Sequence, residues 1–122
     1  GVPVLIMGYE YWPEALEAVI RYVHEETGVP VLVTENGIGT DDDAQRIDYV
    51  RRAVAGVARC LGDGIPVLGY FYWSLLDNFE WMLGYAPRFG LVAVDRATQE
   101  RIPKASSAAY ADIVRAHAIA LE

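Results

Sequence analysis

Glu35 occupies a position in this chain of 122 residues where many α/β proteins do their chemistry. The run Val-Leu-Val-Thr at residues 31–34 precedes it, and the breaker Asn-Gly follows it at once. This pattern predicts an acidic side chain at the carboxyl end of a buried strand, where the backbone turns away. Parallel α/β folds place their active sites at that end. The alternative interpretation, a solvated residue that simply ends a strand, stays open on residues 31–39 alone.

A second group of chemically suited side chains follows an aromatic, apolar run. Residues 73–81 read Trp-Ser-Leu-Leu-Asp-Asn-Phe-Glu-Trp, which places two indoles among two carboxylates and an amide. Sugars offer hydroxyls to carboxylates and amides, and apolar C–H faces that stack on aromatic rings. Trp73, Glu80 and Trp81 beside Glu35 would therefore suit a pyranose. An aromatic corner packed as core filler is the alternative, and the interleaved acids disfavour it.

The elements that must position these residues alternate along the chain. Apolar residues at helical spacing predict helices, and apolar runs between glycines predict strands. The expected helices cover residues 12–28, 41–62 and about 105–120, and the expected extended segments cover 29–34, 65–73 and 90–94. Helices that alternate with strands imply parallel pairing through right-handed crossovers. Two parallel strands leave unpaired edges and one bare face, so we expect further strands from a longer chain or from partner chains.

Composition narrows the classes of function. The chain is 53% apolar and 22% charged, which is typical of a globular protein. Its net charge of −7 argues against nucleic acid as a partner. No apolar run reaches the roughly 18–20 residues that span a bilayer, and we expect neither a membrane segment nor a signal peptide. The single cysteine, Cys60, is expected to be a buried hydrophobe and favours an intracellular, cytoplasmic location.

Five stretches of the chain resemble glycoside hydrolase family 1, the β-glucosidase family. Two resemble its signature segments, Thr-Glu-Asn-Gly at residues 34–37 and the Trp-to-Trp segment at residues 73–81, and the spacing between them also fits. The others are Gly-Tyr-Glu-Tyr-Trp-Pro-Glu at 8–14, Gly-Tyr-Ala-Pro-Arg-Phe-Gly-Leu at 84–91 and Arg-Ile-Pro-Lys-Ala-Ser at 101–106. The resemblance runs nearly from end to end, and these motifs are long and ordered.

The resemblance implies a fold and a set of residue roles. The family fold is an eight-stranded α/β barrel, a TIM barrel, and this chain resembles only its C-terminal portion: helix 6, strand 7, helix 7, strand 8 and helix 8. Residues 1–122 would then form a single partial domain. By resemblance, Glu35 matches the catalytic nucleophile and Trp73 the ring that stacks under the substrate. Glu80 matches the carboxylate that binds glycone hydroxyls, and Trp81 lies beside it on the same sugar.

The family mechanism is retaining hydrolysis of terminal β-D-glucosyl residues. One carboxylate attacks the anomeric carbon, while a second, about 5–5.5 Å away, protonates the leaving oxygen and later activates water. The resemblance implies no metal and no organic cofactor. The family's acid/base Glu lies in a Thr-x-Asn-Glu-Pro segment, which this chain lacks. We therefore expect the isolated fragment to be inactive without a complementary N-terminal barrel chain.

A partial barrel also has consequences for association. Apolar side chains of both strands, such as Val31, Val33, Leu68 and Tyr70 or their neighbours in register, are expected to be exposed. The chain would then self-associate or bind another chain. A non-catalytic barrel fragment, or a weak carbohydrate-binding or assembly module, is the alternative function. Within the enzyme interpretation the substrate is a β-glucoside or related oligosaccharide, with β-galactosidase and β-fucosidase activities as plausible additions.

Other motifs have simpler explanations. Gly-Ile-Gly at residues 37–39 lacks the third glycine of a dinucleotide site, and the acids that follow it would repel a pyrophosphate. The three aspartates at residues 41–43 are interpreted as a helix cap rather than a cation site. Glu14 is expected to be a capping and surface charge, and residues 46–48 are expected to carry ordinary surface charges.

Overall fold

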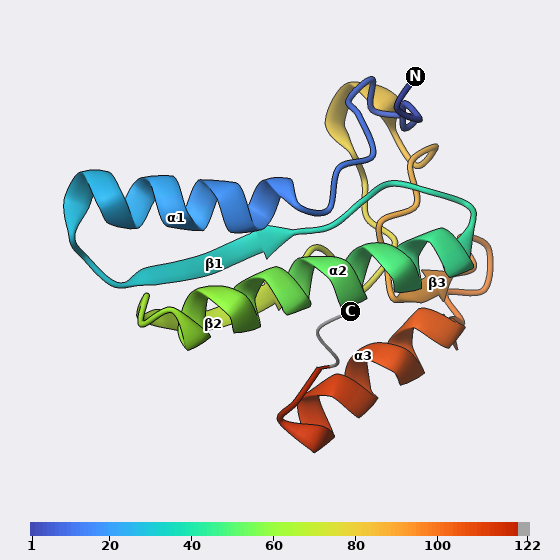
Figure 1. Cartoon of the computed structure of the whole chain (residues 1–122). Coiled ribbons are helices and arrows are strands. Elements are labelled where there is room, and N and C mark those ends of the chain that lie inside the picture. The colour runs from blue at the N-terminus through green and yellow to red at the C-terminus, as the bar shows by residue number, and fades with distance from the viewer. Residues whose placement is uncertain (120–122) are drawn as a thin grey trace.

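The computed structural model describes residues 1–119 and arranges them as helices that alternate with strands (Figure 1). In chain order the elements are α1 (Ala15–Thr27), β1 (Val31–Asn36), α2 (Asp43–Gly62), β2 (Val67–Tyr72), the short 3-10 helix η1 (Trp81–Leu83), β3 (Val92–Val94), β4 (Arg101–Pro103) and α3 (Ala105–Ala116). Among the helices of residues 1–119, none combines the length and the apolar character needed to cross a bilayer.

Local signals set the junctions on either side of β1, as expected. Gly28 ends α1 in the left-handed conformation, with φ at +67°, and its N–H donates to the carbonyl of His24. Asp42 precedes α2, and its carboxylate accepts the N–H groups of Ala44 and Gln45. These bonds satisfy amides that have no partner inside the helix. The acidic run before α2 is therefore a helix cap.

The last helix is shorter than the sequence predicts. It ends at Ala116, and His117 adopts a left-handed conformation with φ at +50°. The expected helix runs to about residue 120, and residues 120–122 lie outside the described residues.

The strands β1 and β2 pair in parallel, as the alternation of elements predicts. Helices cover one face of this pair (Figure 1), and the main core lies between that face and α1 and α2. Its buried members are Ile20, Val33, Val57 and Cys60. Cys60 is thus the buried hydrophobe that its surroundings predict. A second cluster under the loop after β1 contains Leu5, Ile38, Tyr49 and Ala53.

The buried stripe of α2 agrees in part with the sequence. Apolar spacing predicts a stripe through Ile47, Val50, Val54, Val57 and Leu61, of which Val50 and Val57 are buried, Ile47 and Val54 are half-buried, and Leu61 is 51% exposed. The buried residues of this helix are Arg46, Tyr49, Val50, Ala53, Ala55, Gly56, Val57 and Cys60. The buried face is therefore wider than the expected stripe and departs from it at Leu61, and an arginine begins it.

The other face of the β1–β2 pair is open. Leu32 and Phe71 share this face, because both side chains approach Gly69, and both are exposed. Two apolar side chains in water on a parallel pair are unusual, since parallel sheets are covered on both faces. The open face therefore marks a surface that a complete sheet would bury.

Both strands expose apolar side chains, as expected, but only some of the residues named in the expectation are exposed. Val33 is buried at 7% exposure, because it faces the helices. Val31 and Tyr70 are half-buried against the same core. Leu68 is exposed, as expected.

A short antiparallel hairpin, β3 with β4, follows the long loop after β2. The extended segment expected at residues 90–94 is β3, whereas its partner β4 was not expected. β4 consists of Arg, Ile and Pro, and all three are exposed. Proline cannot donate to a ladder, and an exposed three-residue strand has no apolar alternation to detect.

Candidate functional site

Glu35 lies at the carboxyl end of β1, on a β-bulge. Val33 pairs with Tyr70 and Asn36 pairs with Tyr72, so three steps along β1 match two steps along β2. The extra residue breaks the alternation of side chains, and both Thr34 and Glu35 are exposed. Bulges re-aim side chains in this way beside active sites. The bulge therefore turns Glu35 out of the helix-covered core.

Asn36 fixes the end of the strand from the opposite side. Its Nδ2 donates to the hydroxyl of Tyr49 at 3.1 Å, and its Oδ1 accepts the hydroxyl of Tyr70 at 3.0 Å. The side chain of Asn36 thus lies toward α2, on the core side of the pair. The neighbouring Glu35 is exposed, so the last two side chains of β1 lie in different surroundings.

Gly37 lets the two predicted segments approach each other. A Cβ on Gly37 would lie 1.9 Å from the carbonyl oxygen of Trp73, which is far inside van der Waals contact. The N–H of Trp73 donates to the carbonyl of Asn36 at 2.9 Å. The structure therefore brings the backbones that carry Glu35 and Trp73 side by side. The Trp73–Ser74 peptide bond is cis.

The other two predicted residues lie on the loop after β2. Glu80 is half-buried, and its Oε2 accepts a hydrogen bond from Asn78 Nδ2 at 2.8 Å. Trp81 begins η1 and is 82% exposed, and Trp73 is 38% exposed. These side chains do not form a packed aromatic corner. They lie on an open surface of residues 1–119.

The N-terminal segment lies beside this loop. Val4, Ile6 and Ala86 line one small cavity, and Figure 1 shows the N-terminal segment next to η1. Burial raises the pKa of Tyr9, and the negative charge of Glu80 contributes to the same rise. Residues 8–14, one of the stretches with a family resemblance, are thus close to the loop that carries Glu80.

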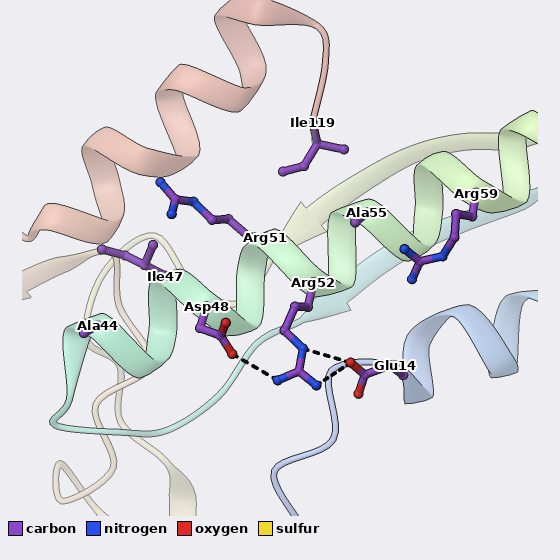
Figure 2. Close-up of a pocket in the computed structure, with 9 residues that line it drawn as sticks. All are labelled: Glu14, Ala44, Ile47, Asp48, Arg51, Arg52, Ala55, Arg59 and Ile119. Carbon is purple, nitrogen blue, oxygen red and sulfur yellow. Dashed lines mark hydrogen bonds and ion pairs between the residues drawn. The ribbon is translucent and has the colours of Figure 1, made fainter. Parts of the chain in front are cut away.

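A cavity of about 680 Å³ lies elsewhere, on the outer surface of α2 (Figure 2). Two of its three arginines are engaged with carboxylates: Arg52 Nε donates to Glu14 at 2.8 Å, and Arg59 pairs with Glu17 at 2.7 Å. Glu14 is the N-cap residue of α1 and a surface charge, as expected, but its side chain makes no cap bond and pairs with Arg52 instead. The residues lining this cavity include neither Glu35 nor any of the three predicted sugar-binding residues.

Arg46 joins the two loops that carry the predicted site. The expectation of a surface charge is wrong, because the side chain is 1% exposed. Its guanidinium donates to the carbonyl of Thr40, after β1, and to the carbonyl of Arg88 at 2.7 Å, after η1. The N–H of Thr40 also donates to the Arg88 carbonyl at 3.1 Å. One buried side chain thus holds both loops together.

The same network reaches α3. Asp43 accepts a hydrogen bond from Arg46, and it also accepts the N–H and hydroxyl of Ser106 at 2.8 and 2.7 Å. Despite partial burial, which opposes ionisation, the bonds from Ser106 and Arg46 lower the pKa of Asp43. In the sequence, the signal for this ion pair is the spacing of three residues between Asp43 and Arg46, which places both on one side of a helix.

Asp77 and Lys104 form a second anchor that sequence reasoning missed. The Lys104 ammonium lies 2.8 Å from Asp77 Oδ1, and both side chains are mostly buried. Asp77 Oδ1 also accepts the N–H of Gly90 at 2.8 Å, and Lys104 donates to the Gly90 carbonyl at 2.7 Å. The pair ties the start of the loop after β2 to the start of α3.

The described residues 1–119 contain no group of three His, Cys, Asp or Glu side chains placed to hold a metal ion. The acids before α2 are engaged otherwise. Asp42 caps the helix, Asp43 binds Arg46 and Ser106, and Asp41 pairs with Arg88 at 3.2 Å.

Comparison with known proteins gives the same family as the motifs. A sequence model of glycosyl hydrolase family 1 matches residues 2–119. The chain is 42% identical to β-glucosidase A of Thermotoga maritima over 124 aligned residues, which cover 93% of this chain and 28% of that protein. It is also similar to the apo structure of a β-glucosidase numbered 1317, with a TM-score of 0.93 and 52% identity over 95% of this chain and 29% of the other.

A further solved structure contains a ligand. It is β-glucosidase from Thermotoga maritima in complex with glucoimidazole, with a TM-score of 0.90 and 41% identity over 94% of this chain and 28% of the other. The chain thus spans less than a third of the length of these relatives. The chain belongs to glycosyl hydrolase family 1, and its α/β fold is the C-terminal portion of that family's TIM barrel.

Proposed function

We propose that this chain supplies the nucleophile and part of the sugar site of a retaining β-glycosidase, with a β-glucoside as substrate. Glu35 is the nucleophile, and Trp73, Glu80 and Trp81 bind the sugar. The acid/base carboxylate comes from the rest of the barrel, because the chain contains no Thr-x-Asn-Glu-Pro segment. A complementary N-terminal barrel chain, or the remainder of one longer chain, completes the site.

The proposed reaction has two steps. A carboxylate oxygen of Glu35 attacks the anomeric carbon, the bond to the leaving oxygen breaks, and the acid/base carboxyl protonates that oxygen. Water then attacks the same carbon, the acid/base carboxylate takes its proton, and Glu35 leaves as a carboxylate. Two inversions at one carbon give net retention. The carboxylate of Glu80 accepts hydrogen bonds from sugar hydroxyls, and the two indoles contact the apolar faces of the sugar ring.

The bulge at Glu35 is the observation that carries this proposal. It turns a carboxylate out of a helix-covered sheet at the carboxyl end of a parallel strand, where TIM barrels have their active sites. Gly37 supports the assignment, because it lets the neighbouring strand end, with Trp73, approach the same point. A residue that merely ended a strand would need neither feature.

The test uses a completed barrel. This chain replaces the matching section of β-glucosidase A of Thermotoga maritima, to which it is 42% identical. The chimeric barrel is incubated with a 2-deoxy-2-fluoroglucoside that has a good leaving group, and the labelled peptide is identified by mass spectrometry. We expect one fluoroglucosyl group, bound to Glu35.

Substitution completes the test. Glu35→Gln should lower kcat by about 10⁴-fold or more, because the covalent route is lost while the barrel is retained. Glu25→Gln, on the exposed end of α1, is the matched control and should leave kcat unchanged. Label on another carboxylate, or normal turnover by the Glu35 variant, would show that the nucleophile is assigned wrongly.

A non-catalytic assembly module is the second candidate function. The open face with Leu32 and Phe71 favours it, because this face offers apolar surface to another chain whatever the fate of Glu35. The two candidates differ in the chimeric barrel, since a module would complete the fold without restoring turnover. The cytoplasmic location inferred from the single cysteine stays a prediction.

A further inference from the structure

The geometry points to Asn78 as a positioning residue that holds one oxygen of Glu80 and leaves the other free for the sugar. This inference rests on the proposed function, in which Glu80 binds glycone hydroxyls. It concerns a residue between the two predicted sugar contacts, in a loop whose exposed part makes few contacts of its own.

The bonds of Asn78 fix the direction of its amide. Its Nδ2 donates to Glu80 Oε2 at 2.8 Å, and its Oδ1 accepts the hydroxyl of Ser74 at 3.3 Å. Ser74 is buried, and its single O–H is shared with the carbonyl of Leu76, to which it donates at the shorter distance of 2.6 Å. An amide can donate to a carboxylate on one side only while its oxygen accepts on the other. The chain Ser74–Asn78–Glu80 therefore has one direction.

The carboxylate of Glu80 needs such a restraint because the neighbouring side chains are exposed and do not confine it. Phe79 is 54% exposed, and Trp81 and Met82 are more exposed still. The backbone of the loop is closed by the Glu80 N–H, which donates to the Gly84 carbonyl at 2.6 Å. That bond fixes the main chain and leaves the side-chain torsions of Glu80 free. Asn78 is the described residue whose side chain donates to the carboxylate of Glu80.

The Asp77–Lys104 pair keeps Asn78 in place. Asp77 precedes Asn78 directly, and its N–H donates to the carbonyl of Val92 at 3.0 Å while its side chain binds Lys104. A Cβ at Gly90 would lie 2.2 Å from the Asp77 nitrogen, so the return of the loop passes immediately beside this anchor. The backbone that carries Asn78 is thus held by buried contacts, and its side chain reaches from there toward the exposed loop.

This arrangement predicts an effect on sugar binding more than on bond breaking. With Oε2 occupied by Asn78, Oε1 of Glu80 stays available to a hydroxyl donor. Loss of the amide lets Glu80 adopt other rotamers, and each binding event must then order it again. Hydrogen bonds to charged groups are strong enough for a loss of about tenfold in affinity.

The test is kinetic, in the chimeric barrel with p-nitrophenyl glucoside. Asn78→Ala should raise KM about tenfold and leave kcat within about threefold. Asn78→Asp, which keeps the size of the side chain but replaces the donor with an acceptor, should raise KM at least as much. The near-isosteric variant keeps the test informative if the alanine variant folds poorly. Wild-type KM in both variants would overturn the inference.

A double-mutant cycle separates positioning from general damage. In a Glu80→Ala background, Asn78→Ala should change KM no further, because the carboxylate that Asn78 positions is absent. Additive losses in the two variants would show that Asn78 acts on the fold and would overturn the inference. An unchanged KM for Glu80→Ala alone would instead contradict the proposed function, so the two failures are distinguishable.

Discussion

At the scale of single residues, the site depends on small departures from regular structure. One extra residue in β1 exposes Glu35, and one missing side chain at Gly37 lets the Trp73 backbone approach. The motif Thr-Glu-Asn-Gly identified this position in the sequence. In the structure, each of its last three residues has a distinct local environment. Asn36 holds the strand end from the core side, and the neighbouring Glu35 is exposed.

Two half-buried tyrosines of β2 make the fold sensitive to alkali. Burial raises the pKa of Tyr72 to about 12 and raises that of Tyr70 as well, from about 10 in an unfolded chain. A raised tyrosine pKa means that the neutral form is favoured by folding. This contribution is fully present below pH 10 and is lost as the pH rises through the folded value.

We therefore expect the chain to unfold above pH 10, with the transition largely complete a little above pH 12. Circular dichroism should record the unfolding, and tyrosinate absorbance at 295 nm should record the ionisation. The two signals should rise together for the last tyrosines to ionise. Ionisation of all eight tyrosines near pH 10 with unchanged circular dichroism would contradict this expectation.

At the scale of elements, Arg46 connects the loops that follow β1 and β2. The guanidinium lies between the loop after β1, the return of the loop after β2, and the start of α3 through Asp43. Removal of one partner from a buried ion pair is costly, because the other charge keeps its desolvation without compensation.

Arg46→Met should lower the free energy of unfolding by about 3 kcal/mol. Arg51→Met, on the exposed face of the same helix, is the matched control and should change it by less than about 0.5 kcal/mol. Urea unfolding at matched protein concentration measures both. Equal stability of the two variants would mean that the buried contacts of Arg46 contribute little.

The elements also show how far sequence reasoning reached. The ends of α1 and α2, the parallel pairing of β1 with β2, and the position of Glu35 were predictable, because caps, glycines and apolar runs are local signals. The burial of Arg46 was not, because it depends on a segment far away in the chain. The hairpin partner β4 was not, because an exposed strand of three residues has no apolar alternation to detect. The placement of Trp73 beside the Glu35 strand followed from topology, while the roles of Asp77 and Asn78 needed side-chain contacts.

At the scale of the whole molecule, an incomplete barrel determines behaviour in solution. Leu32 and Phe71 are exposed on a face that has no second layer within residues 1–119, and the chain spans less than a third of the length of its relatives. Under the proposed function, the molecule carries one of the two carboxylates that a retaining glycosidase needs.

The isolated chain should therefore have no measurable glucosidase activity and should associate with itself or with a complementary chain. General acid catalysis alone is worth about 10²–10⁴-fold, and the absent sugar contacts add to the loss. Turnover of p-nitrophenyl glucoside and sedimentation velocity measure the two properties. Robust turnover, or a single monomeric species with a sharp thermal transition, would contradict this expectation.

The buried guanidinium of Arg46 has one more consequence, for motion. Because it binds main-chain oxygens of both loops, opening of one loop breaks the same contacts that close the other. The two loops then form a single cooperative unit whose amides exchange with solvent together. Thermal fluctuation would loosen the loop after β1 and the return of the loop after β2 together, and would leave their spacing intact in every closed molecule.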